Sequence, residues 1–294
     1  MDTDTSEQWQ KLLWRSQSFP DNYVPQGMFL SSLRRNLNFT PYDYKSLALL
    51  SCPITQHLAM TLVFLDVFIQ LKDRSLDPRM LVLLTTTLFL VGYASWELIL
   101  YFTSSDRRGN ADRVKGLKSS ILIFLALMSL SPVLRTLTAA TSSDSIWALS
   151  AALFLVSLLL ADYGPSKTVG HSQESLTSVL SINAAISSSV VLASRLSDDL
   201  GVFALILFSV QTFALFPFLR RRIQAVSTRL QVSLTAVLSI AALLLWSRRS
   251  VAIALLFACI LVSVTLLAPM ILLWAQKYKN EIRGPWDVAV PKVN

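Results

Sequence analysis

Long apolar runs separated by short polar and basic segments fill most of the chain. In the middle, two such runs at Leu117–Leu134 and Ile146–Ala161 are joined by a polar link, and the second run ends in Asp162-Tyr163-Gly164. Because an α-helix rises about 1.5 Å per residue, roughly 20 apolar residues cross the hydrocarbon core of a bilayer. The pattern therefore predicts an all-α, polytopic membrane helix bundle with about eight transmembrane helices. The expected spans are 46–71, 79–102, 117–137, 145–161, 175–194, 200–219, 229–246 and 251–274.

The composition fits a membrane chain with polar ends. Hydrophobic residues make up 53% and charged residues 15% of the 294 residues, whereas soluble domains carry about 25% charged residues. Before the first run, apolar stripes at 9–13 and 29–37 carry basic residues on another face, a pattern typical of short interfacial helices. Packing of these stripes on another protein explains them equally well. We expect an N-terminal segment with interfacial helices over 1–45, a transmembrane bundle over 46–274 and a C-terminal tail over 275–294.

Basic residues gather in alternate loops. If both termini lie in the cytosol, 19 of the 26 Lys and Arg residues fall on the cytosolic side, in agreement with the positive-inside rule. This distribution predicts cytosolic termini. Because the net charge of +8 is concentrated in short loops, no nucleic-acid partner is expected. The basic residues left on the opposite side, with the adjacent pair Arg248-Arg249 as the main irregularity, are Lys72, Arg74, Arg79, Arg135, Arg195, Arg248 and Arg249.

A few polar side chains fall inside or beside the expected spans, and their depth decides how each is interpreted. Asp66 comes twenty residues into the first span, so we expect it to reach water at an interface. His57 is nearer the middle of that span and is expected to be hydrogen-bonded within the bundle. Asn183 lies in a fifth span rich in small residues, which favours close packing and hydrogen bonds between helices, with a polar groove for a lipid headgroup as the alternative. Arg135 and Arg195 fall near the opposite face, where structural ion pairs with nearby aspartates are expected.

The sequence contains no signature of a soluble catalytic site or of a metal site. Glycine loops for nucleotides, the serine-hydrolase elbow and zinc-protease motifs are missing, and Cys52 and Cys259 both fall inside expected spans. We expect no catalytic residue, no metal and no cofactor. Directly after the sixth span, Arg220-Arg221-Arg222 form a candidate site for the headgroup of an anionic lipid. Ordinary positive-inside bias explains these arginines at least as well.

Six short motifs are spread from the N-terminal segment to the C-terminal tail. They are Phe19-Pro20-Asp21-Asn22-Tyr23-Val24, Ser131-Pro132-Val133-Leu134-Arg135-Thr136-Leu137-Thr138, Asp162-Tyr163-Gly164, Leu192-Ala193-Ser194-Arg195-Leu196, Phe213-Ala214-Leu215-Phe216-Pro217 and Gly284-Pro285-Trp286-Asp287. In this order they resemble the motifs of the PIG-C family, whose members are polytopic subunits of the phosphatidylinositol N-acetylglucosaminyltransferase (GPI-GlcNAc transferase) complex. The resemblance extends over nearly the whole chain.

The resemblance implies a non-catalytic membrane subunit of the complex that transfers N-acetylglucosamine from UDP-N-acetylglucosamine to phosphatidylinositol, the first step of GPI-anchor biosynthesis. It implies an endoplasmic-reticulum membrane location, a catalytic PIG-A-like glycosyltransferase partner, other small membrane subunits, and phosphatidylinositol as a candidate ligand. Asp162 and Tyr163 lie on the cytosolic face in this topology and join the three arginines as headgroup candidates. The expected partner-docking residues are Phe19, Pro20, Asp21, Asn22, Tyr23, Pro285, Trp286 and Asp287.

Two other functions remain open at this stage. Pro132, Pro217 and Pro269 interrupt or end spans, as in transporters whose broken helices line a binding site. A secondary transporter of a lipid or small molecule is therefore the main alternative, although no inverted repeat accompanies the prolines. The third hypothesis is a self-sufficient membrane transferase that uses Asp162.

Overall fold

The computed structural model describes residues 16–20, 23, 34–35, 41–103, 110–136, 142–164, 176–278 and 282–283. The chain divides into two units, one formed by residues 44–270 and the other by the two tails, 1–43 and 271–294. The first unit is close in extent to the bundle that the sequence predicts over 46–274.

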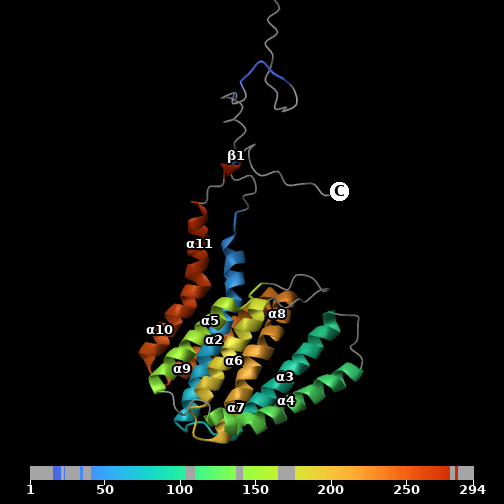
Figure 1. Ribbon diagram of the computed structural model, residues 1–294, viewed down its shortest axis with the longest axis vertical. Coiled ribbons are helices and arrows are strands. Elements are labelled where there is room, and N and C mark those ends of the chain that lie inside the picture. Colours follow the sequence, from blue (N-terminus) through green and yellow to red (C-terminus); the bar gives the residue numbers. More distant parts are fainter. Residues whose placement is uncertain are drawn as a thin grey trace, which may run out of the picture. The chain divides into compact units, whose positions relative to one another are not determined.

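The larger unit is built from helices joined by short links (Figure 1). In the described part of the chain, six helical stretches are long and apolar enough to cross a membrane, and two shorter apolar stretches lie at Leu122–Leu134 and Asp144–Leu160. These stretches confirm the eight predicted spans to within a few residues. Two spans are continuous runs, α7–η1–α8 and α10–η2–α11, each with a π-helical turn inside. The helices are α2 (Tyr44–Lys72), α3 (Pro78–Thr103), α4 (Asn110–Thr136), α5 (Ser143–Leu160), α6 (Leu176–Ala193), α7 (Asp199–Ser209), η1 (Val210–Leu215), α8 (Phe216–Val226), α9 (Thr228–Ser247), α10 (Val251–Val262), η2 (Ser263–Leu267) and α11 (Ala268–Gln276).

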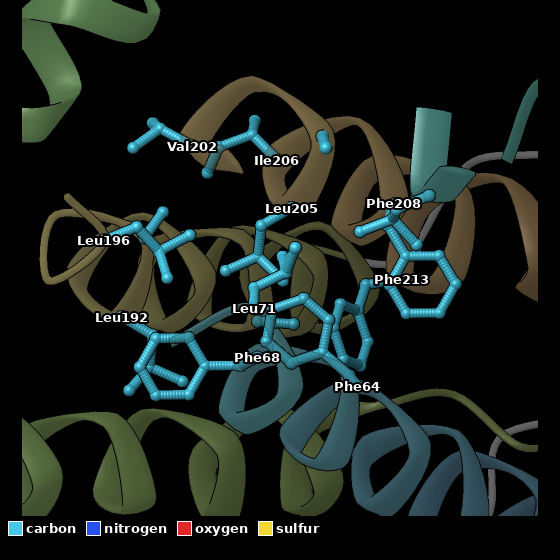
Figure 2. Packing of buried hydrophobic residues seen from close by; sticks show 14 of the residues in the cluster. Phe64, Phe68, Leu71, Leu192, Leu196, Val202, Leu205, Ile206, Phe208 and Phe213 are labelled. Carbon is cyan, nitrogen blue, oxygen red and sulfur yellow. The ribbon is translucent and has the colours of Figure 1, made fainter. Parts of the chain in front are cut away.

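The core of the bundle forms around α2, which is buried along much of its length. Figure 2 shows phenylalanine and leucine side chains of α2, α6, α7 and η1 packed together. Phe64 stacks on Phe208 with ring centroids 6.1 Å apart and meets Phe213 edge-on at 5.4 Å. Because lipid tails are as apolar as these side chains, dense packing rather than escape from water holds such helices together.

Serine side chains join α5 to α6. Ser181 donates a hydrogen bond to the Ser157 carbonyl at 2.7 Å, and Ser188 donates to the Ser150 carbonyl at 2.9 Å. The two pairs are seven residues apart on each helix and run in opposite directions, so α5 and α6 pack antiparallel in close contact. This confirms the predicted close packing of the fifth span.

A proline inside α2 is compensated by a side chain of α9. Pro53 has no N–H, so the carbonyl of Leu49, four residues earlier, loses its helical partner. The Gln231 side-chain amide donates to that carbonyl at 2.9 Å. The hydrocarbon core offers no water to replace the missing donor, and the interhelical bond therefore both satisfies the backbone and fixes α9 against α2.

The same compensation occurs at two other prolines. Beside Pro132, the Ser131 hydroxyl donates to the Met128 carbonyl at 3.1 Å, the group that the proline leaves unpaired. Before Pro269, the π-helical η2 exposes carbonyls, and Ser51 and Tyr44 of α2 donate to two of them at 3.1 and 3.3 Å. The kinked spans are thus closed by hydrogen bonds within the bundle.

The Asp66 side chain is a correction to the sequence-based interpretation. It does not reach water, since it is 1% exposed and accepts hydrogen bonds from Arg249 at 2.8 Å and Gln70 at 2.6 Å. Arg249 also contacts Asp73 at 3.2 Å. The hydrogen bond from Arg249 to Asp66 is the main cause that raises the pKa of Arg249 above its ordinary value. These ion pairs neutralise one residue of the irregular Arg248-Arg249 pair and fix the α9–α10 link to α2.

The second unit joins the two tails of the chain. Strand β1 (Arg34–Arg35) pairs antiparallel with β2 (Ile282–Arg283). The Tyr42 amide also donates to the Gln276 side chain at 3.1 Å. Within the stripe at 29–37, the two described residues form a strand rather than the expected interfacial helix, because the other tail supplies backbone partners. The stripe at 9–13 lies outside the described residues.

Changing Gln231 to Leu removes the donor to the Leu49 carbonyl. We expect a loss of about 1 kcal/mol in stability, because an interhelical hydrogen bond in a membrane is worth roughly 0.6–1.7 kcal/mol. Adding Pro53→Ala restores a backbone N–H for the same carbonyl, so the double variant should recover part of the loss. The measurement is the midpoint of heat-induced aggregation in mild detergent, with Ser233→Leu on the same helix as the control. Equal midpoints for the single and double variants would contradict this account.

Changing Arg249 to Ala leaves the buried Asp66 carboxylate without its cation. Breaking a buried pair costs about 3–5 kcal/mol, and the partial exposure of Arg249 places the expected loss at or below the lower end of that range. Arg248→Ala is the matched control, because that side chain is exposed. In the same heating assay, Asp66→Asn added to Arg249→Ala should recover stability. Equal effects of the two arginine changes would show that the ion pair is not stabilising.

Candidate functional site

Three consecutive arginines of α8 point in three directions, because successive residues of an α-helix are rotated by about 100°. Arg220 is directed into the bundle and is 4% exposed. Arg221 lies between the end of α5 and the start of α6. Arg222 is exposed, with its guanidinium 5.1 Å from the ring of Trp96 on α3. Only the first two help to build an enclosed site.

The Arg220 guanidinium is buried without a carboxylate in hydrogen-bond contact. Its Nη1 donates to the Pro53 carbonyl at 3.1 Å, and its central carbon lies 5.4 Å from the ring centroid of Tyr163. Among the described residues, its buried Nε has no hydrogen-bond partner. A buried cation held by a carbonyl and a ring face retains unused capacity to bind an anion.

Tyr163 connects the arginine to α2. Its hydroxyl donates to the Leu158 carbonyl at 2.8 Å and lies 3.0 Å from His57 Nδ1. Because a phenol has one proton, His57 is the donor in the second bond, which assigns its proton to Nδ1. Burial raises the pKa of Tyr163 to about 12, with the nearby Arg220 charge acting in the opposite direction. Tyr163 is therefore neutral at physiological pH, and His57 is hydrogen-bonded in the bundle as the sequence predicts.

Asp162 and Arg221 form the outer part of the site. Their side chains lie 3.6 Å apart, and Asp162 is about half exposed. Arg221 also donates to Ser178 of α6 at 3.2 Å, while its buried Nε has no partner among the described residues. The Asp162 carboxylate accepts a hydrogen bond from the Gly164 amide at 3.0 Å. An exposed ion pair of this kind contributes at most about 1 kcal/mol, so it orients these groups more than it stabilises the fold.

These residues lie at one depth. Counted from the opposite ends of their spans, Trp96, Asp162 and Arg220 come after 18, 19 and 21 residues. At about 1.5 Å per residue they lie roughly 27–32 Å along, which is the thickness of the hydrocarbon core. The arginine cluster, defined as His57, Asp162, Tyr163, Arg220 and Arg221, is thus at the level of the lipid headgroups on one membrane face.

The chemistry of the arginine cluster suits an anion. Two guanidinium groups offer N–H donors in a planar fork, the arrangement that binds phosphate or carboxylate most effectively. In the described part of the chain, no group of three His, Cys, Asp or Glu side chains could hold a metal ion. Of the predicted headgroup candidates, the structure brings Asp162, Tyr163, Arg220 and Arg221 together and places Arg222 beside them on another face of α8.

Sequence reasoning missed two contributors to the cluster. The Pro53 carbonyl accepts from Arg220, and the Ser178 hydroxyl accepts from Arg221. A proline within the first span was a visible signal, because prolines in membrane helices mark backbone that needs outside partners. No signal in the sequence distinguishes Ser178 from the other serines of α6.

The predicted docking residues are only partly described. Phe19 and Tyr23 stack with ring centroids 4.7 Å apart, and the Tyr23 amide donates to the Pro20 carbonyl at 2.8 Å, which closes the turn expected there. The remaining docking residues lie outside the described residues and are Asp21, Asn22, Pro285, Trp286 and Asp287.

The other predicted polar residues lie away from the arginine cluster. Asn183 is exposed on α6, on the side away from α5. Arg195 lies in the turn before α7, where Asp198 caps the helix by accepting from the Gly201 amide at 3.2 Å. Arg135 lies in α4, and its side chain is outside the described residues.

Comparison with known proteins assigns the family. A family model described as phosphatidylinositol N-acetylglucosaminyltransferase matches residues 9–287, a range that includes every span and the arginine cluster. This chain belongs to that family.

Relatives within the family match along almost their whole length. The phosphatidylinositol N-acetylglucosaminyltransferase GPI2 subunit of Schizosaccharomyces pombe is 38% identical over 97% of this chain and 87% of its own. A subunit of the transferase of the same name from Homo sapiens is 35% identical over 98% of this chain and 94% of its own. Its counterpart from Rattus norvegicus is 36% identical over 97% and 94%. No solved structure matches the chain.

Proposed function

We propose that this protein is a non-catalytic, multi-pass membrane subunit of the complex that transfers N-acetylglucosamine from UDP-N-acetylglucosamine to phosphatidylinositol, the first step of GPI-anchor biosynthesis. The observation that carries the proposal is the family match over residues 9–287, with relatives named as subunits of this transferase. The complex lies in the endoplasmic-reticulum membrane, and a PIG-A-like glycosyltransferase supplies the catalytic residues.

The proposed topology places both tails and the arginine cluster on the cytosolic side. An even number of spans returns the chain to the side where it began, and the pairing of β1 with β2 supports tails that share one side. The cluster lies at the end of the bundle where α2 begins, since Pro53 is in the first part of that helix. The excess of basic residues in the same set of loops supports the cytosol as that side.

Within the complex, the arginine cluster binds the phosphate of phosphatidylinositol. Arg220 and Arg221 have N–H groups available at the headgroup level, and Tyr163 and His57 hold them in place. An anion at this position would neutralise the buried charge of Arg220, which the described residues leave without a hydrogen-bonded carboxylate. The lipid would then be presented to the catalytic partner at the membrane surface.

Two rival functions have less support. The prolines that suggested a transporter have their freed carbonyls bonded at Leu49, Met128 and Thr265, which supports a role in shape rather than a broken helix open to a substrate. The carboxylate of Asp162 is engaged by Arg221 and by the Gly164 amide, which supports a structural role rather than that of a general base.

The first test is biochemical. A tagged chain isolated from membranes in mild detergent should bring a glycosyltransferase subunit and transfer N-acetylglucosamine to phosphatidylinositol, whereas the chain purified away from its partners should transfer none. Transfer by the isolated chain would overturn the non-catalytic role. Isolation without any transferase would contradict membership of the complex.

The second test concerns the lipid. Arg220→Gln keeps hydrogen-bonding capacity but removes the charge, and charged hydrogen bonds are worth about 1.5–3 kcal/mol. We therefore expect the KM of the assembled complex for phosphatidylinositol to rise at least tenfold, with little change in the KM for UDP-N-acetylglucosamine. Arg229→Gln, an exposed arginine of α9, is the matched control. An unchanged KM, or the same rise in the control, would contradict the headgroup site.

A further inference from the structure

One face of α6 is left uncovered by the rest of the bundle. Leu176, Leu180, Asn183 and Ser187 are all exposed and recur at spacings of four, three and four residues. This spacing aligns side chains in one narrow row along a helix and is the spacing of a helix–helix seam. The row lies opposite the face that packs on α5, which Figure 1 shows beside α6. We call this row the Asn183 face.

The polar part of the Asn183 face lies near the middle of the membrane. Asn183 is the eighth of the 18 residues of α6, a helix apolar and long enough to span the bilayer. At about 1.5 Å per residue, its Cα is roughly 10–15 Å from either end of the helix. Acyl chains at that depth neither donate nor accept hydrogen bonds, so a carboxamide facing them carries an unfavourable free energy.

Other exposed polar side chains in the spans are satisfied within their own helix. Thr86 and Thr87 of α3 donate to carbonyls one turn earlier at 2.8 Å, and Ser233 of α9 does the same at 3.0 Å. Among the described residues, neither the Asn183 amide nor the Ser187 hydroxyl has a hydrogen-bond partner. Asn183 brings both a donor and an acceptor, which a single helix of its own cannot satisfy.

We propose that the Asn183 face packs against a transmembrane helix of another subunit of the transferase complex, which presents a hydrogen-bonding side chain at the same depth. The inference rests on the proposed function, because relatives named as subunits of one transferase imply partner chains in the same membrane. A helix fits better than lipid, since polar side chains across a helix pair satisfy each other, while Leu176 and Leu180 supply apolar contact on one side of the contact point.

A photo-crosslinking amino acid placed at position 183 of the full chain tests the occupant in intact membranes. The expected product is an adduct between this chain and one other subunit, identified by mass spectrometry. The same probe at Ser233 is the control for a lipid-facing position. An adduct between two copies of this chain, or adducts with lipid only, would overturn the proposal.

A pair of substitutions gives an independent readout. Asn183→Leu should lower recovery of the partner subunit in detergent about three- to tenfold, the size expected for one interhelical hydrogen bond, while Asn183→Gln retains most of it. Ser233→Leu should leave recovery unchanged. If the wild-type chain recovers its transferase partners and Asn183→Leu recovers them equally, this inference fails and the proposed function stands. If the wild-type chain recovers none, the proposed function itself fails.

Discussion

Every polar group that this chain carries into hydrocarbon needs a partner within the protein, and this constraint shapes the bundle. The constraint is clearest at Pro53, where the missing N–H would leave the Leu49 carbonyl unpaired and Gln231 of α9 supplies the donor. Side chains do the same beside Pro132 and Pro269. The prolines therefore bend or tighten spans while their partners fix which helices lie side by side.

The same constraint separates two arginine environments. At one end of the bundle, Arg249 is held by the carboxylates of Asp66 and Asp73, so its charge is neutralised by the chain itself. At the other end, Arg220 has a carbonyl and an aromatic ring as its described neighbours, and its Nε is left over. A neutralised arginine is structural, whereas an arginine with surplus positive charge at headgroup depth is suited to an anionic ligand.

Run length and charge in the sequence predict the spans well, because each span needs enough apolar residues and its loops carry the topology signal. The sequence also places Asp162, Tyr163 and the three arginines at one membrane face, and the structure brings four of these five into one cluster. What run length cannot supply is the direction in which each side chain points around its helix. Asp66 was expected to reach water and is buried, because its face of α2 meets Arg249.

The central claim is that Arg220 is an anion site completed by the lipid substrate. Mass spectrometry of the complex released from mild detergent measures the lipids that remain bound to it. We expect phosphatidylinositol to be retained by the wild-type complex and lost from Arg220→Gln, with all subunits still present. Equal retention of phosphatidylinositol by both complexes would contradict the claim.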